Sequence, residues 1–268
     1  MNQKGWLYRL SGLHTWLVFG FIYLPVVVLM VFSFNQERIN AVWTGFTTEW
    51  YLRLLDDREM QEAVLNSLII GGVSTVIATI IGTLLAYGMF RFAFRGKRLL
   101  ESVLYLPIII PEIVMAISLL SFYVWIQFAL GHASIILAHV TFNISFVAVV
   151  VGARLSGLDP SLEQAARDLG ATAWQAFRKI TLPLIMPGVI SGALIAFTLS
   201  WDDFLIAFFT SGVGSTTLPM KVYSMIKFGV SPEINAISTL MLLFTMILVF
   251  IALRLEGIFT TARKMGGK

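Results

Sequence analysis

The sequence predicts an all-α integral membrane protein with six membrane-spanning helices, and three observations support this fold class. The chain has 268 residues, of which 57% are hydrophobic and only 13% are charged. A soluble domain carries about 25% charged residues, and one core of this size cannot bury so much apolar surface. Apolar stretches of about 20 residues, the length that crosses a bilayer, recur six times. They are continuous runs, without the two-residue alternation of a membrane β-barrel.

The six apolar stretches follow one another along the chain, and the third is interrupted by Pro107, Pro111 and Glu112. Proline removes a backbone donor, so we expect a loosened helix there. The predicted spans are residues 16–34, 67–90, 103–130, 133–153, 188–210 and 236–253. A short surface helix is predicted within residues 43–62. No linker or internal repeat divides the chain, so we predict one domain over 1–268, with its core at about 66–257.

The positions of lysine and arginine predict the orientation in the membrane. Six spans place both termini and two loops on one side. That side holds about fourteen of the 19 Lys and Arg residues, and the other side holds five. Cytoplasmic loops carry the excess of positive charge, so both termini should be cytoplasmic. The five outer residues are Arg38, Arg53, Arg58, Lys221 and Lys227.

The loop between the fourth and fifth spans, about residues 154–187, is the longest polar segment between spans. Asp159, Pro160 and Ser161 predict the start of a helix, with a capping residue and a proline in the first turn. Gly170 predicts its end, because glycine accepts a left-handed conformation. Two interpretations remain open from the residues alone. The segment is either an amphipathic connector on the membrane surface or a docking helix for a cytoplasmic protein.

This loop resembles the EAA signature of ABC importer permeases, E-A-A-x3-G-x9-I-x-L-P. The matching residues are Gln164, Ala165, Ala166, Gly170, Ile180, Leu182 and Pro183. The sequence departs at one position, because Gln164 occupies the place of the glutamate and Glu163 precedes it. Either side chain is a candidate for the polar contact with a partner.

The resemblance implies a type I ABC importer permease, in which this loop is a coupling helix. Its candidate contact residues for the ATPase are Glu163, Gln164, Ala165, Ala166, Asp168 and Gly170. The resemblance also implies a second, paralogous permease chain, two ATPase subunits, and a periplasmic or lipid-anchored binding protein. The sequence has no Walker A pattern, so ATP and Mg would be bound by the ATPase and no cofactor by this chain.

Three acidic residues lie within the predicted spans. Charge in a span costs about 2.5–3.5 kcal/mol on insertion scales, so such residues tend to face a cavity or a partner. Glu112 follows Pro111, and Asp202 and Asp203 follow Trp201. Together they suit an organic cation, through charge pairing and cation–π contact. Alternatively, the two aspartates mark an outer helix end, and Glu112 shares a proton or makes an interhelical hydrogen bond.

Further segments are similar to spermidine/putrescine permeases, and the resemblance covers nearly the whole chain. It rests on the segments 111–120, 200–204 and 218–236. It implies polyamine transport across the bacterial inner membrane. Other solutes of related permeases, such as opines, phosphonates or thiamine, remain alternatives, as does an ATPase-independent secondary transporter. The chain has no cysteine and no nucleophile–base pair, so we expect neither an enzyme nor a metal site. We expect no nucleic acid partner, because the excess of lysine and arginine is explained by the orientation of the chain in the membrane.

Overall fold

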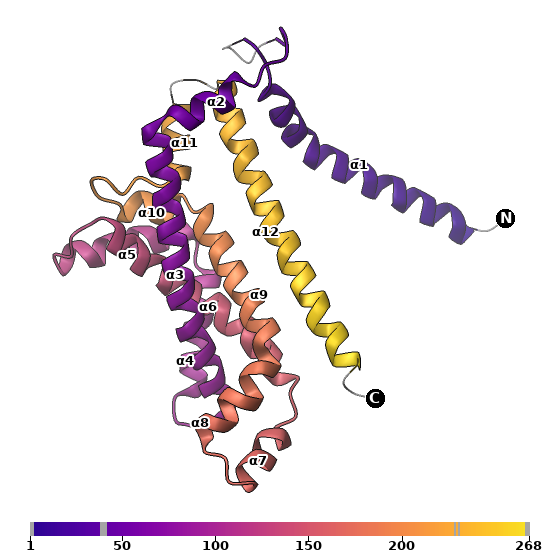
Figure 1. Cartoon of the computed structure of the whole chain (residues 1–268), viewed down its shortest axis with the longest axis vertical. Coiled ribbons are helices and arrows are strands. Elements are labelled where there is room, and N and C mark those ends of the chain that lie inside the picture. The colour runs from indigo at the N-terminus through magenta and orange to yellow at the C-terminus, as the bar shows by residue number, and fades with distance from the viewer. Residues whose placement is uncertain (1–2, 38–41, 228, 230, 266–268) are drawn as a thin grey trace. The chain divides into compact units, whose positions relative to one another are not determined.

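The computed structural model describes residues 3–37, 42–227, 229 and 231–265. Arg38, one of the five cations assigned to the outer side, lies outside the described residues, as do Phe228 and Val230 of the third matching segment. Within the described part all regular structure is helical, apart from one isolated bridge between Asn35 and Phe46. The elements in chain order (Figure 1) are α1 Gln3–Phe32, α2 Glu49–Asp56, α3 Arg58–Arg91, α4 Lys97–Ile109, α5 Glu112–Trp125, α6 His132–Ser156, α7 Ser161–Asp168, α8 Ala173–Ala176, the π-helix η1 Phe177–Thr181, α9 Leu182–Trp201, α10 Leu205–Thr210, α11 Leu218–Ile226 and α12 Pro232–Met265.

Five described segments are long and apolar enough to cross a membrane: Ser11–Phe32, Arg58–Arg91, His132–Ser156, Ala173–Trp201 and Pro232–Ile251. A sixth is obtained if α4 and α5 count as one span, although they are bent by 110° where they meet. The membrane-protein fold class is therefore confirmed.

Two predicted spans are not continuous helices. The span predicted over 103–130 breaks at Ile110, whose ψ of 133° is extended, and α5 begins after Pro111. Proline disfavours the helical region for its preceding residue, which favours a break at this position. The span predicted over 188–210 ends at Trp201 and resumes as α10 at Leu205.

The chain forms two compact units, of which the first comprises residues 1–61 and 222–244. Asn35, which is fully buried, organises the segment between α1 and α2. Its side-chain amide donates to the carbonyl of Val42 at 2.9 Å, and its side-chain oxygen accepts from the amide of Thr44 at 3.0 Å. The indole of Trp50 donates to its carbonyl at 2.7 Å. The short helix predicted within 43–62 is confirmed as α2.

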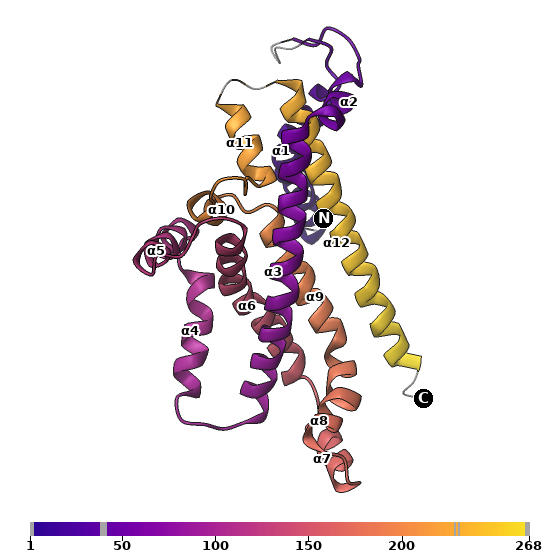
Figure 2. The ribbon, with the colours of Figure 1, turned by 60° about the vertical axis from the view of Figure 1, so that its left-hand side comes forward.

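The second unit comprises residues 62–221 and 245–268, and its centre is the contact of α6 with α9 (Figure 2). Glycines on α9 allow this approach. A β-carbon at Gly188 would lie 2.9 Å from the β-carbon of Arg154, and one at Gly192 would lie 3.4 Å from the α-carbon of Val147. Small residues at an interface let two helix backbones pack closely. The G-x-x-x-G spacing of α9 therefore packs helices within this chain.

The loop between α6 and α9, residues 157–181, contains two short helices and a π-helix. Gly170 has a φ of +91° and follows α7, so the predicted glycine stop is confirmed. Thr172 then begins α8, where its hydroxyl accepts from the amide of Gln175 at 3.2 Å. We hereafter call residues 157–181 the α6–α9 loop. The prediction of a single domain over 1–268 stays a prediction.

Candidate functional site

The three acidic residues predicted within spans come together at the two helix breaks. Glu112 is the first residue of α5, and Asp202 and Asp203 occupy the gap between α9 and α10. The side chain of Glu112 lies within electrostatic range of both Asp203 and Asp202. Residues about 90 positions apart in sequence therefore form one acidic cluster, which we call the acid cluster (Glu112, Asp202, Asp203).

Asp203 is the buried member of the acid cluster, with 7% of its surface exposed. Its carboxylate accepts hydrogen bonds from the backbone amides of Ile206 at 3.3 Å and Ala207 at 2.8 Å. The ring nitrogen Nε2 of His139 lies 3.2 Å from Oδ2. The side chain therefore satisfies the first amides of α10 and connects α10 to α6.

Glu112 and Asp202 are both exposed in this chain. They are the members of the acid cluster that are open to a solute. Trp201 is only 4% exposed and stacks on Phe197, with ring centroids 6.2 Å apart. Its ring therefore supports the end of α9 from the interior of the chain.

A buried polar network, which no pattern in the sequence indicates, lies next to the acid cluster. The side-chain amide of Asn143 donates to the hydroxyl of Ser200 at 2.8 Å, and that hydroxyl lies 3.2 Å from the hydroxyl of Ser74. His139 belongs to the same helix as Asn143. An ionisable residue within an apolar span is itself a signal of function, so His139 was detectable in principle. Its partner was not, because Asp203 is 64 residues away.

The α6–α9 loop presents most of the predicted coupling residues outward. Gln164, Ala165, Asp168 and Gly170 are exposed, and Ala166 is half-buried. The outward surface of α7 is therefore available to a partner. The exception among the predicted coupling residues is Glu163, which is only 8% exposed.

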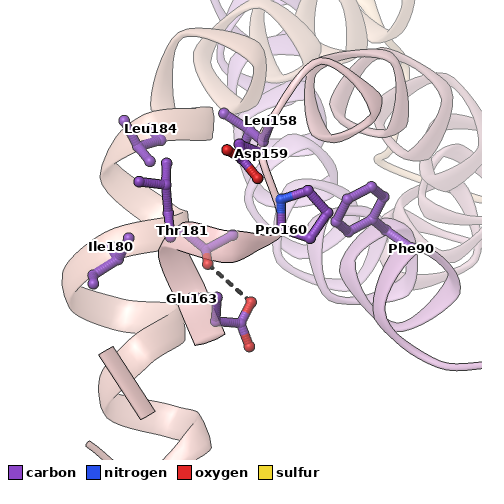
Figure 3. A pocket seen from close by; sticks show the side chains of 9 residues that line it. Phe90, Leu158, Asp159, Pro160, Glu163, Ile180, Thr181 and Leu184 are labelled. Atoms are coloured by element: carbon purple, nitrogen blue, oxygen red, sulfur yellow. Dashed lines mark hydrogen bonds between the residues drawn. The ribbon is translucent and has the colours of Figure 1, made fainter. Parts of the chain in front are cut away.

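Glu163 points into the chain, toward α3 and η1. Its Oε1 accepts hydrogen bonds from the hydroxyl of Tyr87 at 2.9 Å and from Nε of Arg91 at 3.1 Å. Its Oε2 accepts from the hydroxyl of Thr181 at 3.3 Å, as Figure 3 shows. Of the two neighbouring candidates, the exposed one is thus Gln164. A small pocket borders Glu163 and is lined by Phe90, Leu158, Asp159, Pro160, Leu162, Glu163, Ile180, Thr181 and Leu184.

Asp159 stabilises the start of α7 through a hydrogen bond. Its carboxylate accepts from the backbone amide of Ser161 at 2.9 Å. This hydrogen bond holds the pKa of Asp159 below its usual value, because it stabilises the ionised form. The helix-start signal seen in the sequence therefore corresponds to a hydrogen bond just before α7.

Metal binding has no support in the described part of the chain. No group of three or more His, Asp or Glu residues there has a geometry that could hold an ion.

Comparison with known proteins places the chain in a family. The family model for the "Binding-protein-dependent transport system inner membrane component" matches residues 78–264. The chain is 41% identical over 232 residues to the spermidine/putrescine transport system permease protein PotC of Escherichia coli (strain K12), covering 87% of this chain and 88% of that protein. It is 46% identical over 231 residues to the putrescine transport system permease protein PotI of the same strain, covering 84% and 82%.

A solved structure shares the fold. A bacterial ABC transporter involved in the import of the acidic polysaccharide alginate matches with a TM-score of 0.72 at 20% identity, covering 97% of this chain and 96% of that chain. The resemblance to ABC importer permeases is confirmed by the family model and by the two relatives. This chain belongs to the family of inner membrane components of binding-protein-dependent transport systems, whose members are transport subunits.

Proposed function

We propose that this chain is a membrane-spanning subunit of an ATP-driven importer that carries polyamines, spermidine or putrescine, across the bacterial inner membrane. The observation that carries the proposal is the identity of 41% and 46%, over more than four fifths of both chains, to permeases named for these substrates. The remaining subunits would be a paralogous permease chain, two ATPase subunits, and a periplasmic or lipid-anchored binding protein.

The acid cluster fits a cationic substrate. Polyamines are flexible chains of ammonium groups, and carboxylates recognise them through charge-assisted hydrogen bonds. We assign the contact with substrate to the exposed Glu112 and Asp202. Asp203 already accepts from three groups, so it holds the backbone that positions Asp202. Trp201 supports the same backbone from within. Two open acids favour entry of a polycation without trapping it, which transport requires.

The α6–α9 loop would connect this chain to the ATPase subunit. We propose that α7 docks on the ATPase with its exposed side, using Gln164, Ala165, Ala166 and Asp168, and that Gly170 sets the end of the docking helix. The loop then faces the cytoplasm, in agreement with the positive charge that predicts both termini on that side. ATP and Mg would bind to the ATPase, and this chain would hold no cofactor. Closure of the ATPase would move α7 and, with it, the spans that surround the acid cluster.

Uptake in cells tests the function. Cells that lack this chain but retain the other subunits are given wild-type chain, Glu112→Gln, Asp202→Asn or the double variant Asp202→Asn/Asp203→Asn. We expect wild type to restore uptake of labelled spermidine or putrescine. Each acid variant should lower it at least tenfold at equal membrane levels, since one lost charge-assisted contact is worth about 1.5–3 kcal/mol. Glu101→Gln on α4 is the matched control, because Glu101 lies outside both sites, and it should transport normally.

Other outcomes select the alternatives. If wild type restores ATP-dependent uptake of an opine, a phosphonate or thiamine and no polyamine, the importer stands and the substrate assignment is wrong. If polyamine uptake persists without the ATPase subunits, the chain works as a secondary transporter and the proposal fails.

A further inference from the structure

A buried carboxylate connects the outward-facing helix of the α6–α9 loop to the rest of the chain. Glu163 is in the first turn of α7, and its side chain is 10% exposed. Its neighbour Gln164 is exposed on the same helix. Glu163 therefore cannot offer its carboxylate to a protein that approaches from outside, although it stands beside the family's glutamate position.

The groups that bind Glu163 come from two separate elements. Tyr87 and Arg91 lie one turn apart at the end of α3, and Thr181 is the last residue of η1. Three donors on one carboxylate join α7, α3 and the helix that leads into α9. We call this group the α7 latch (Tyr87, Arg91, Glu163, Thr181).

The surroundings of the α7 latch favour a tight connection. Arg91 is one third exposed and Glu163 is nearly buried, so the pair is less screened than an ion pair at the surface. A ring contact adds a second link between α3 and η1, because the rings of Tyr87 and Phe177 have centroids 4.5 Å apart. A buried charge that loses its partners is strongly disfavoured, so α7 resists separation from α3.

Beyond the latch, α7 packs on α8 and η1, the neighbouring elements of the α6–α9 loop. Asp159 accepts from the amide of Ser161 at its start, and its end runs through Gly170 at a φ of +91° into the next short helix. The hydrogen bonds of Glu163 give a displacement of the outer surface of α7 a direct side-chain connection to α3.

We propose that Glu163 is a positioning residue that locks α7 to α3 and η1, so that movement of α7 by the ATPase displaces α3 together with α9. The inference rests on the proposed docking of α7 to an ATPase and adds the path by which the movement reaches the membrane. Glu163 acts through Arg91, Tyr87 and Thr181, and Gln164 is left to face the ATPase.

The first test measures coupling in the complete complex. Wild type, Glu163→Ala, Arg91→Ala and the double variant are each purified with the second permease chain and the ATPase. They are reconstituted in proteoliposomes with the binding protein, and spermidine transported per ATP hydrolysed is measured. We expect the ATPase to remain bound and ATP to be hydrolysed, while each single variant transports about tenfold less per ATP, within the usual range of coupling between sites. The double variant should lose no more than a single one, because the two residues act as one unit.

Two variants sharpen the test. Glu163→Gln keeps an oxygen that accepts from Tyr87 and Arg91, so it should transport more per ATP than Glu163→Ala. Glu101→Gln is a control outside the latch and should match wild type. If Glu163→Ala releases the ATPase, Glu163 is a docking contact and the latch is wrong. Equal transport per ATP in wild type and Glu163→Ala also overturns it.

The second test needs no transport, so it separates failure of the latch from failure of the proposed function. The natural sequence has no cysteine. Spin labels at Ser161→Cys and Phe92→Cys therefore report the distance between the start of α7 and the end of α3. We expect one narrow distance distribution in wild type and a broad one in Glu163→Ala. An unchanged distribution contradicts the latch even if the complex imports polyamines. A narrow wild-type distribution in a complex without ATP-driven uptake contradicts only the proposed function.

Discussion

Two pairs of adjacent polar residues each combine a buried acid with an exposed neighbour. One pair lies in the α6–α9 loop and the other at the break between α9 and α10. Glu163 is 8% exposed and Gln164 is exposed; Asp203 is 7% exposed and Asp202 is exposed. In each pair the buried acid accepts three hydrogen bonds from the chain itself. The exposed neighbour is the group that can meet another molecule.

The two buried acids differ in the donors that hold them. Glu163 uses side chains, among them the cation of Arg91, whose side chain is 34% exposed. Asp203 uses two backbone amides of α10 and the ring of His139, which is 2% exposed. Arg91 lies near the surface, where its charge keeps contact with water. The backbone amides that hold Asp203 are uncharged, so no permanent second charge is buried there. In both pairs the fold anchors a buried acid directly beside an exposed polar residue.

The largest effect is expected from replacing each of the two aspartates in turn. Asp203→Ala leaves His139 and two amides without their acceptor, so the complex should lose about 3 kcal/mol of stability. Asp202→Ala removes an exposed group and should change stability by less than about 0.5 kcal/mol while lowering uptake. Thermal unfolding of the purified complex, followed with labelled uptake, measures both. Equal destabilisation by the two variants would break the comparison.

The next largest effect on stability is expected from replacing His139, the partner of Asp203. His139→Leu leaves Asp203 with one donor fewer in a buried site, so we expect a loss of about 2 kcal/mol. The matched control is His132→Leu, seven residues earlier on α6. His132 is exposed and lies 2.8 Å from the side-chain oxygen of Asn66, so its loss should cost less than about 0.5 kcal/mol. Chemical unfolding of the two variants in detergent decides between these values.

A smaller effect is expected at the end of α7. A β-carbon at Gly170 would meet no atom within 4 Å, so Gly170→Ala is disfavoured only by the positive φ. That conformation costs an L-residue about 1–2 kcal/mol. We expect less ATPase to co-purify with Gly170→Ala than with wild type. Gly170→Asn should retain more, because asparagine tolerates this region better. If alanine and asparagine behave alike, the conformation of Gly170 does not control docking.

The smallest effect concerns pH and Asp159. Its pKa is lower in the fold than in the unfolded chain, because its carboxylate accepts from Ser161. The contribution to stability is therefore complete above the unfolded pKa of about 3.9 and is lost as the pH falls through the folded value. ATPase binding should be constant from about pH 8 to pH 5 as far as this group is concerned. In a pull-down titration at pH 7, Asp159→Asn should bind the ATPase about as well as wild type. A large loss at pH 5 that Asp159→Asn abolishes would contradict this assignment.

Much of the fold followed from local patterns. Apolar runs of about 20 residues predicted the spans because a bilayer imposes that length. The helix start at Asp159 and the glycine stop at Gly170 predicted the bounds of α7 within a residue or two, since caps are local. Pro111 predicted a disturbed helix, and the structure has a complete break with a bend of 110°. The size of that bend depends on packing around α5, which no local pattern contains.

The sequence by itself determined the membrane class, the loop that carries the family signature, and which acids lie in apolar surroundings. Only the tertiary structure decided which member of each polar pair faces inward. The orientation of Glu163 depends on Tyr87 and Arg91, more than 70 residues away, and that of Asp203 depends on His139, 64 residues away. Adjacent residues on a helix or a turn point in different directions, and the direction that is buried is set by donors that the rest of the fold brings near.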